Sequence, residues 1–98
     1  MAGLQATLWE GGTRAAALLY GPMLARPGTI SRALVHVTDW LPTLVRAAGG
    51  DPATLPRLDG VDQWAGLVRG AGRGPRREML YNIDPLRDGD SGPNAAIR

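Results

Sequence analysis

The chain has no cysteine, no lysine and no phenylalanine, and it has one histidine among its 98 residues. The missing cysteines exclude disulfides, a thiol nucleophile and every Cys-ligated metal site. The missing lysines exclude Schiff-base chemistry, and a single histidine excludes a metal site built from several histidines of this chain. The 98 residues therefore carry few of the side chains that perform catalysis in other proteins.

Large aliphatic residues and net charge are also scarce. A chain of 98 residues forms a single domain at most. Leucine, isoleucine and valine together number 21 of these residues, which predicts a thin core and a marginal fold when the chain is alone. The 11 arginines exceed the acidic residues by two, so we do not expect nucleic acid as a partner. No apolar run reaches the length of a membrane span, and the Met1 end lacks the pattern of a signal peptide.

Two stretches have the periodicity of short amphipathic helices. In the first, apolar residues recur at spacings of three and four, and they are Trp40, Leu41, Leu44, Val45 and Ala48. We expect Thr38 or Asp39 to cap this helix, Thr43 to lie on its polar side, and Gly49 to end it with a left-handed conformation. The second helix is predicted to open at residues 58–62 and to end at Arg69-Gly70. Its apolar stripe comprises Val61, Trp64, Leu67 and Val68.

Four other stretches are predicted to be strands: residues 15–20, 30–37, 78–84 and 95–98. The first is apolar on both faces, as in a strand buried inside a sheet. The pair Gly11-Gly12 and the segment Arg26-Pro-Gly-Thr29 predict turns, and residues 85–94 are expected to be polar and flexible. The last strand begins and stops at once, so we expect the chain to be cut within an element.

Several segments carry a family resemblance. In order they are Leu8-Trp-Glu-Gly-Gly-Thr-Arg14, His36-Val-Thr-Asp-Trp-Leu-Pro-Thr43, Leu58-Asp-Gly-Val-Asp62, and Tyr81-Asn-Ile-Asp-Pro85 with Ala95-Ala-Ile-Arg98. In order and spacing they resemble the sulfatase family, most closely its arylsulfatase B-like branch. The resemblance implies an α/β fold of the alkaline-phosphatase-like type, with a large central sheet flanked by helices. Residues 1–98 would then be an incomplete slice of that catalytic domain, with strands and two short helices.

The resemblance also implies an activity. Sulfatases hydrolyse sulfate esters, here of sulfated sugars, with a formylglycine made from Cys or Ser in a Cys/Ser-x-Pro-x-Arg motif and with a calcium ion held by Asp and Asn oxygens. They do so in a lysosomal or secreted setting. The motif does not occur in this chain, whose serines are Ser31 and Ser91. The calcium ligands of the family lie upstream of the matching region. We therefore expect no sulfatase activity and no bound calcium from this chain alone.

One position of the family's active site falls within the chain. A lysine that contacts the sulfate precedes the glutamate of the Glu-Gly-Gly segment by five positions, and this position is Gln5 here. Glutamine can donate a hydrogen bond but has no charge, and charge-assisted bonds are about twice as strong. Residues 1–5 also depart from the family pattern. The chain is thus predicted to hold no catalytic, substrate-binding or metal-binding residue.

Several residues admit both a functional and a structural interpretation. His36 could be a general acid or a metal ligand, and Asp39 a calcium ligand; we favour a part-buried strand residue and a helix-start residue, respectively. Asp59 and Asp62 could be paired carboxylates, although entry from a loop into a helix is the plainer interpretation. The tryptophans could stack on sugar rings, but their spacing favours core positions for all three, Trp9, Trp40 and Trp64.

Arginines support an alternative function of a different class. Residues 69–77 are basic and rich in glycine, and their arginines could contact the phosphate or sulfate groups of a polyanion. We favour an exposed loop with its arginines in solvent. The Glu10-Gly-Gly segment with Arg14 could bind an anion, but a tight turn with an internal arginine pairing is preferred. A third alternative is that the chain has no independent function.

Overall fold

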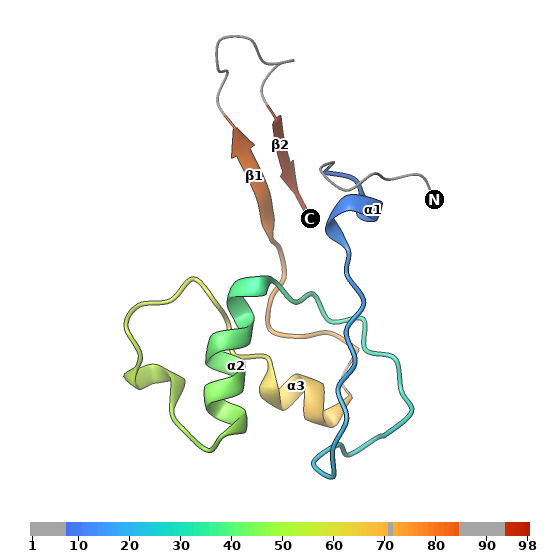
Figure 1. Ribbon diagram of the computed structural model, residues 1–98, viewed down its shortest axis with the longest axis vertical. Coiled ribbons are helices and arrows are strands. Elements are labelled where there is room, and N and C mark those ends of the chain that lie inside the picture. Colours follow the sequence, from blue (N-terminus) through green and yellow to red (C-terminus); the bar gives the residue numbers. More distant parts are fainter. Residues whose placement is uncertain (1–7, 71, 85–93) are drawn as a thin grey trace. The chain divides into compact units, whose positions relative to one another are not determined.

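The computed structural model describes residues 8–70, 72–84 and 94–98 (Figure 1). In chain order the elements are α1 (Glu10–Thr13), the 3₁₀ turn η1 (Val37–Asp39), α2 (Trp40–Ala47), the 3₁₀ turn η2 (Pro52–Thr54), α3 (Trp64–Arg69), β1 (Leu80–Asp84) and β2 (Asn94–Ile97). The chain divides into two compact units, one of residues 1–18 and 78–98, the other of residues 19–77. No helix within the described ranges is long and apolar enough to cross a membrane.

Helix α2, in the unit of residues 19–77, forms where the periodicity predicts it. It starts where predicted, with Asp39 at its N-cap position, but Asp39 makes no side-chain bond to the first turn of α2. The turn η1 precedes the helix, and His36 caps that turn. The ring Nδ1 of His36 accepts a hydrogen bond from the Thr38 N–H at 3.4 Å, and the Asp39 carboxylate accepts one from the His36 N–H at 2.9 Å. The end is as predicted, because Gly49 adopts a left-handed φ of 85°.

The buried side of α2 is not the predicted one. Pro42 and Thr43 are buried, whereas Leu41 and Leu44 of the apolar stripe are exposed. The expectation that Thr43 lies on the outer, polar side is therefore wrong. The loops that face α2 supply hydrogen-bond partners rather than apolar side chains. A polar side chain can be buried where it finds such partners, and this is the case for Thr43.

Helix α3 and two turns complete this unit. The helix begins at Trp64 rather than at residue 58, and the Asp62 Oδ1 accepts a hydrogen bond from the Trp64 N–H at 2.8 Å. It ends as predicted at Gly70, which has a left-handed φ of 64°. The turn predicted at residues 26–29 is confirmed: Gly28 has a φ of 74°, and the Thr29 hydroxyl donates to the Arg26 carbonyl at 2.9 Å.

The strands predicted at residues 15–20 and 30–37 are wrong. Both stretches lack regular structure up to Val37, where η1 begins, and the side chain of Leu18 is 94% exposed. A strand persists only when a neighbouring strand takes up its backbone N–H and C=O groups. No described residue forms a ladder with either stretch. Their apolar character therefore does not suffice to make them strands here.

The unit of residues 1–18 and 78–98 contains the one sheet of the described residues. Strands β1 and β2 are antiparallel, with Leu80 opposite Ile97 and Ile83 opposite Ala95, and the register shifts between Leu80 and Asn82 (Figure 1). The strands predicted at residues 78–84 and 95–98 are thus confirmed. Met79 lies next to β1 and exchanges two backbone hydrogen bonds with Arg98, both of 2.9 Å. Residues 85–93 of the predicted flexible segment lie outside the described residues.

Among the described residues, buried polar side chains outnumber buried large apolar ones. Of the large apolar side chains whose burial is described, Met79 alone is buried. The buried polar side chains are those of Asp39, Thr43 and Gln63, all in the unit of residues 19–77. The interior of that unit is consequently a polar cluster.

Candidate functional site

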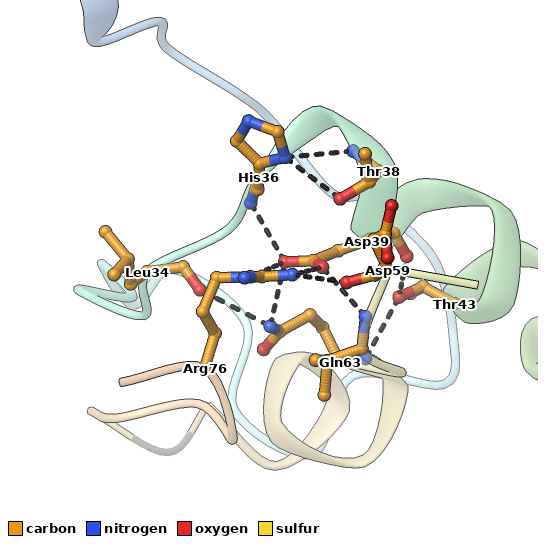
Figure 2. A network of polar contacts seen from close by, with 9 residues as sticks. Leu34, His36, Thr38, Asp39, Thr43, Asp59, Gln63 and Arg76 are labelled. Atoms are coloured by element: carbon orange, nitrogen blue, oxygen red, sulfur yellow. Dashed lines mark hydrogen bonds and ion pairs between the residues drawn. The ribbon is translucent and has the colours of Figure 1, made fainter. Parts of the chain in front are cut away.

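The carboxylate of Asp39 is the centre of this polar cluster (Figure 2). The Arg76 guanidinium approaches it with two nitrogens, Nε at 2.8 Å from Oδ2 and Nη2 at 2.6 Å from Oδ1. Backbone N–H groups add to this: His36 donates to Oδ2 at 2.9 Å and Val61 to Oδ1 at 2.8 Å. Both oxygens of the carboxylate are therefore occupied by donors from three separate segments.

Gln63 and Thr43 form a second part of the cluster. The Gln63 amide Nε2 donates to the Asp39 Oδ2 at 3.2 Å and to the Leu34 carbonyl at 3.4 Å. The Thr43 hydroxyl donates to the Asp39 carbonyl at 2.6 Å and accepts from the Gln63 N–H at 2.9 Å. Gln63 is thus held through both its backbone and its side chain. These bonds fasten the loop before α3 to the first turn of α2.

The environment of Asp39 changes its pKa. Burial on its own raises the pKa of a carboxyl, because it penalises the charged form. Here the Arg76 guanidinium, the N–H groups of His36 and Val61 and the Gln63 amide outweigh burial, and they lower the pKa of Asp39 from 3.8 to about 2. The same ion pair raises the pKa of Arg76. Asp39 is accordingly an ionised structural group, which is unsuited to act as an acid or base near neutral pH.

This pKa predicts how stability depends on pH. Because the pKa is lower in the folded chain than its ordinary value of 3.8, ionised Asp39 stabilises the fold above about pH 4. The contribution, about 2 kcal/mol, is lost as the pH falls from about 4 to about 2. Urea unfolding between pH 6 and pH 2 measures it. An unfolding free energy that stays constant below pH 4 would contradict this assignment, whereas an Asp51→Asn control should retain the decline.

No family profile matches the chain. The chain is 44% identical to Arylsulfatase J of Mus musculus over 84 residues, which is 86% of this chain and 14% of the relative. It is 40% identical to Arylsulfatase A of Bos taurus and 39% to that of Homo sapiens, each over 77 residues, 76% of this chain and 14% of the relative. Over most of its length the chain is therefore homologous to sulfatases. It spans about one-seventh of the length of these relatives.

The resemblance to sulfatases read from the sequence is thereby confirmed, while its B-like branch stays a prediction. The helices and the antiparallel strand pair of the described residues are compatible with the α/β class that sulfatase homology implies. That this chain holds no catalytic, substrate-binding or metal-binding residue stays a prediction. Gln5, at the position of the sulfate-binding lysine, lies outside the described residues.

The calcium ion of the sulfatase family does not fit the described residues. Calcium takes six to eight oxygen ligands, carboxylates in particular. Asp39 is the buried carboxylate of the described part, and its oxygens already accept hydrogen bonds from Arg76, whose positive charge would repel a cation. Within residues 8–70, 72–84 and 94–98 no three His, Cys, Asp or Glu side chains gather as a metal site would require. The described residues therefore do not form a calcium site.

The other candidate residues have structural partners. His36 is half-buried and caps η1, so its predicted place in a strand is wrong, although its structural role is as expected. Asp62 is the entry residue of α3, and its Oδ2 accepts a hydrogen bond from the Arg46 Nε at 3.2 Å. Asp59 contributes its backbone carbonyl, which accepts from the Arg76 Nη2 at 3.1 Å.

The turn predicted at Gly11-Gly12 is wrong, because these residues lie in the one-turn helix α1, and the indoles differ from their prediction too. Glu10 and Arg14 form the predicted internal pair, with the Arg14 Nη1 at 3.2 Å from the Glu10 Oε2, and Arg98 pairs with the other carboxylate oxygen. The core positions predicted for the three tryptophans are wrong. Trp9 and Trp40 are exposed and Trp64 is half-buried, because the segments around them bring no apolar cover within the described residues.

The loop of residues 69–77 differs most from its prediction. Residue 71 lies outside the described residues, and Arg73 and Arg77 are exposed as expected. Arg76 is not in solvent: its side chain is 15% exposed and bound to Asp39. A buried carboxylate attracts a guanidinium more strongly than its neighbouring arginines repel it. The loop thereby loses a cation that the polyanion-binding alternative needs, and the structure does not favour that alternative.

No pattern in the sequence indicates that Arg76 and Gln63 belong to the cluster. They lie 37 and 24 positions from Asp39, and neither belongs to a periodic pattern that points at it. One available signal was the segment Leu58-Asp-Gly-Val-Asp62, because Gly60 allows that loop to approach the Thr38 carbonyl closely. An added Cβ at Gly60 would collide with that oxygen.

Proposed function

We propose that this chain is a structural part of a sulfatase catalytic domain, and that residues outside these 98 carry out sulfate ester hydrolysis in that domain. The observation that carries the proposal is the state of Asp39. The buried carboxylate that an enzyme of this family could use is saturated by Arg76 and by two backbone N–H groups. The missing Cys/Ser-x-Pro-x-Arg motif supports the same conclusion.

The finer attributes of the proposal rest on the family resemblance of the sequence and on the names of the relatives. The relatives are named arylsulfatases, and we propose sulfate esters as the substrate class of the complete domain, with sulfated sugars as the kind of ester. Residues 1–98 would form a partial catalytic domain of the arylsulfatase B-like branch. Calcium would bind to the remainder of that domain, and the protein would work in a lysosomal or secreted setting. The Asp39 cluster would hold the loops of this part in place for the rest.

The experiment is a hydrolysis assay of the purified chain. We expect no release of inorganic sulfate from an arylsulfate ester in the presence of calcium, because losing a catalytic nucleophile costs about 10⁶ in rate. An arylsulfatase A under the same conditions serves as the positive control. Sulfate release in proportion to the amount of the 98-residue chain, retained after repeated purification, would contradict the proposal.

A further inference from the structure

Two reactive groups of the loop before α3 have no hydrogen-bond partner within the described part of the chain. They are the carboxylate of Asp59 and the backbone N–H of Gly60, which are neighbours in the sequence. Asp59 is exposed and Gly60 is half-buried. Glycine has no Cβ that hinders access to its backbone nitrogen. An electrophilic carbon and a nucleophilic nitrogen are therefore adjacent, and the described residues engage neither of them.

These two groups can react with each other without an added reagent. The Gly60 nitrogen attacks the Cγ of the protonated Asp59 carboxyl, a C–N bond forms, and the N–H proton leaves with the carboxyl hydroxyl as water. The product is a succinimide ring. Water then adds to one of its two carbonyls, and the ring nitrogen takes back a proton. Opening at Cγ restores aspartate, whereas opening at the former backbone carbonyl gives isoaspartate, in which the main chain runs through Cβ and Cγ.

The Asp39 cluster restrains this reaction, because it holds the backbone on both sides of the reacting nitrogen. The Asp59 carbonyl accepts a hydrogen bond from the Arg76 Nη2 at 3.1 Å (Figure 2). The Val61 N–H donates to the Asp39 Oδ1 at 2.8 Å. Attack needs the peptide group between Asp59 and Gly60 to turn toward the carboxyl, and a peptide group held at its carbonyl cannot turn without breaking that bond. The loop must thus open locally before the ring can form.

We propose that Asp59-Gly60 is a modification site, at which aspartate converts spontaneously to isoaspartate at a rate set by the opening of the Asp39 cluster. This inference is independent of the proposed function. The product disrupts the cluster in turn. One added methylene in the main chain shifts Gly60 relative to the Thr38 carbonyl, to which it lies so close that an added Cβ would collide. The former Asp59 carbonyl becomes part of a carboxylate, which competes with Asp39 for the Arg76 guanidinium. The modification is thus a one-way conformational switch of the unit of residues 19–77.

The test follows the formation of isoaspartate with time in the full chain at neutral pH, once folded and once in concentrated urea. Trypsin then releases residues 58–69, because Arg57 and Arg69 precede and end this stretch, and chromatography with mass spectrometry separates the aspartate and isoaspartate forms. We expect the folded chain to react more slowly than the chain in urea by about the factor that protects the Val61 amide from hydrogen exchange, since one opening exposes both. Asp59→Glu should abolish the product, because its larger ring forms far more slowly.

Arg76→Gln and Arg73→Gln form a matched pair of variants, because Arg73 is an exposed arginine of the same loop. We expect Arg76→Gln to raise the rate in the absence of urea about fivefold or more, and Arg73→Gln to leave it within about twofold. The purified isoaspartate form should unfold at a lower urea concentration than the parent. Equal rates in the two variants, or equal rates of the parent with and without urea, would overturn the inference. So would the absence of isoaspartate at position 59 in urea. The comparison of the parent with and without urea holds even where Arg76→Gln fails to fold.

Discussion

Replacing Asp39 with asparagine is expected to destabilise the chain by about 3 to 5 kcal/mol. About 2 kcal/mol of this is the lost charge, as on protonation, and the rest arises because the Asn amide N–H groups face N–H donors that the carboxylate accepts. The substitution keeps the shape of the side chain and removes its charge. Arg76, whose side chain is 15% exposed, is then left without the carboxylate that two of its nitrogens contact. Because small domains are stable by only about 5–15 kcal/mol, this loss is a large fraction of the total stability.

The measurement is urea unfolding followed by tryptophan fluorescence, with Asp59→Asn as the matched control. Asp59 bonds to Arg76 through its backbone carbonyl, so its side-chain substitution should leave this contact in place. The control should change the unfolding free energy by less than about 0.5 kcal/mol. An Asp39→Asn variant as stable as the parent would show that the carboxylate does not organise this part of the chain.

The second large effect is expected from Gly60→Ala. An added Cβ would meet the carbonyl oxygen of Thr38 and would lie 3.2 Å from the Pro42 Cγ. A backbone carbonyl at the start of a helix cannot move aside cheaply, so we expect a loss of about 1–3 kcal/mol or more. The next residue, Val61, donates its N–H to Asp39, and the collision should also weaken that bond.

Gly72→Ala is the matched control for this variant. An added Cβ at Gly72 meets nothing within 4 Å, and the same glycine-to-alanine change should be close to neutral there. Urea unfolding gives the stability of both variants, and amide hydrogen exchange at Val61 reports on the bond to Asp39. Equal stability of the two variants, with unchanged exchange at Val61, would contradict the close approach of this loop to Thr38.

Local features of the fold could be predicted from the sequence. Helix α2, its end at Gly49 and the end of α3 at Gly70 follow from periodicity and from glycine's freedom to adopt positive φ. The pairing of Glu10 with Arg14 follows from their separation of four residues. In each case the cause lies within a few residues of its effect.

Features that depend on distant partners could not be predicted. The apolar residues 15–20 match a buried strand, but strand formation needs a neighbour that the described residues do not supply. The spacing of the apolar residues predicted an apolar inner side for α2. Thr43 is buried there instead, because its hydroxyl accepts a hydrogen bond from the Gln63 N–H. Nothing local distinguishes Arg76 from the exposed Arg73 or Arg77; the distinction arises from the position of Asp39 in space.

Above all, the bond between Asp39 and Arg76 is expected to hold together the segments of the unit of residues 19–77. A double-mutant cycle of Asp39→Asn and Arg76→Gln tests it most directly, because the cycle separates this pair from the other contacts of each residue. We predict that the double variant loses less stability than the two single losses combined, with a coupling of about 1–3 kcal/mol. Single losses that add within about 0.5 kcal/mol would contradict the claim.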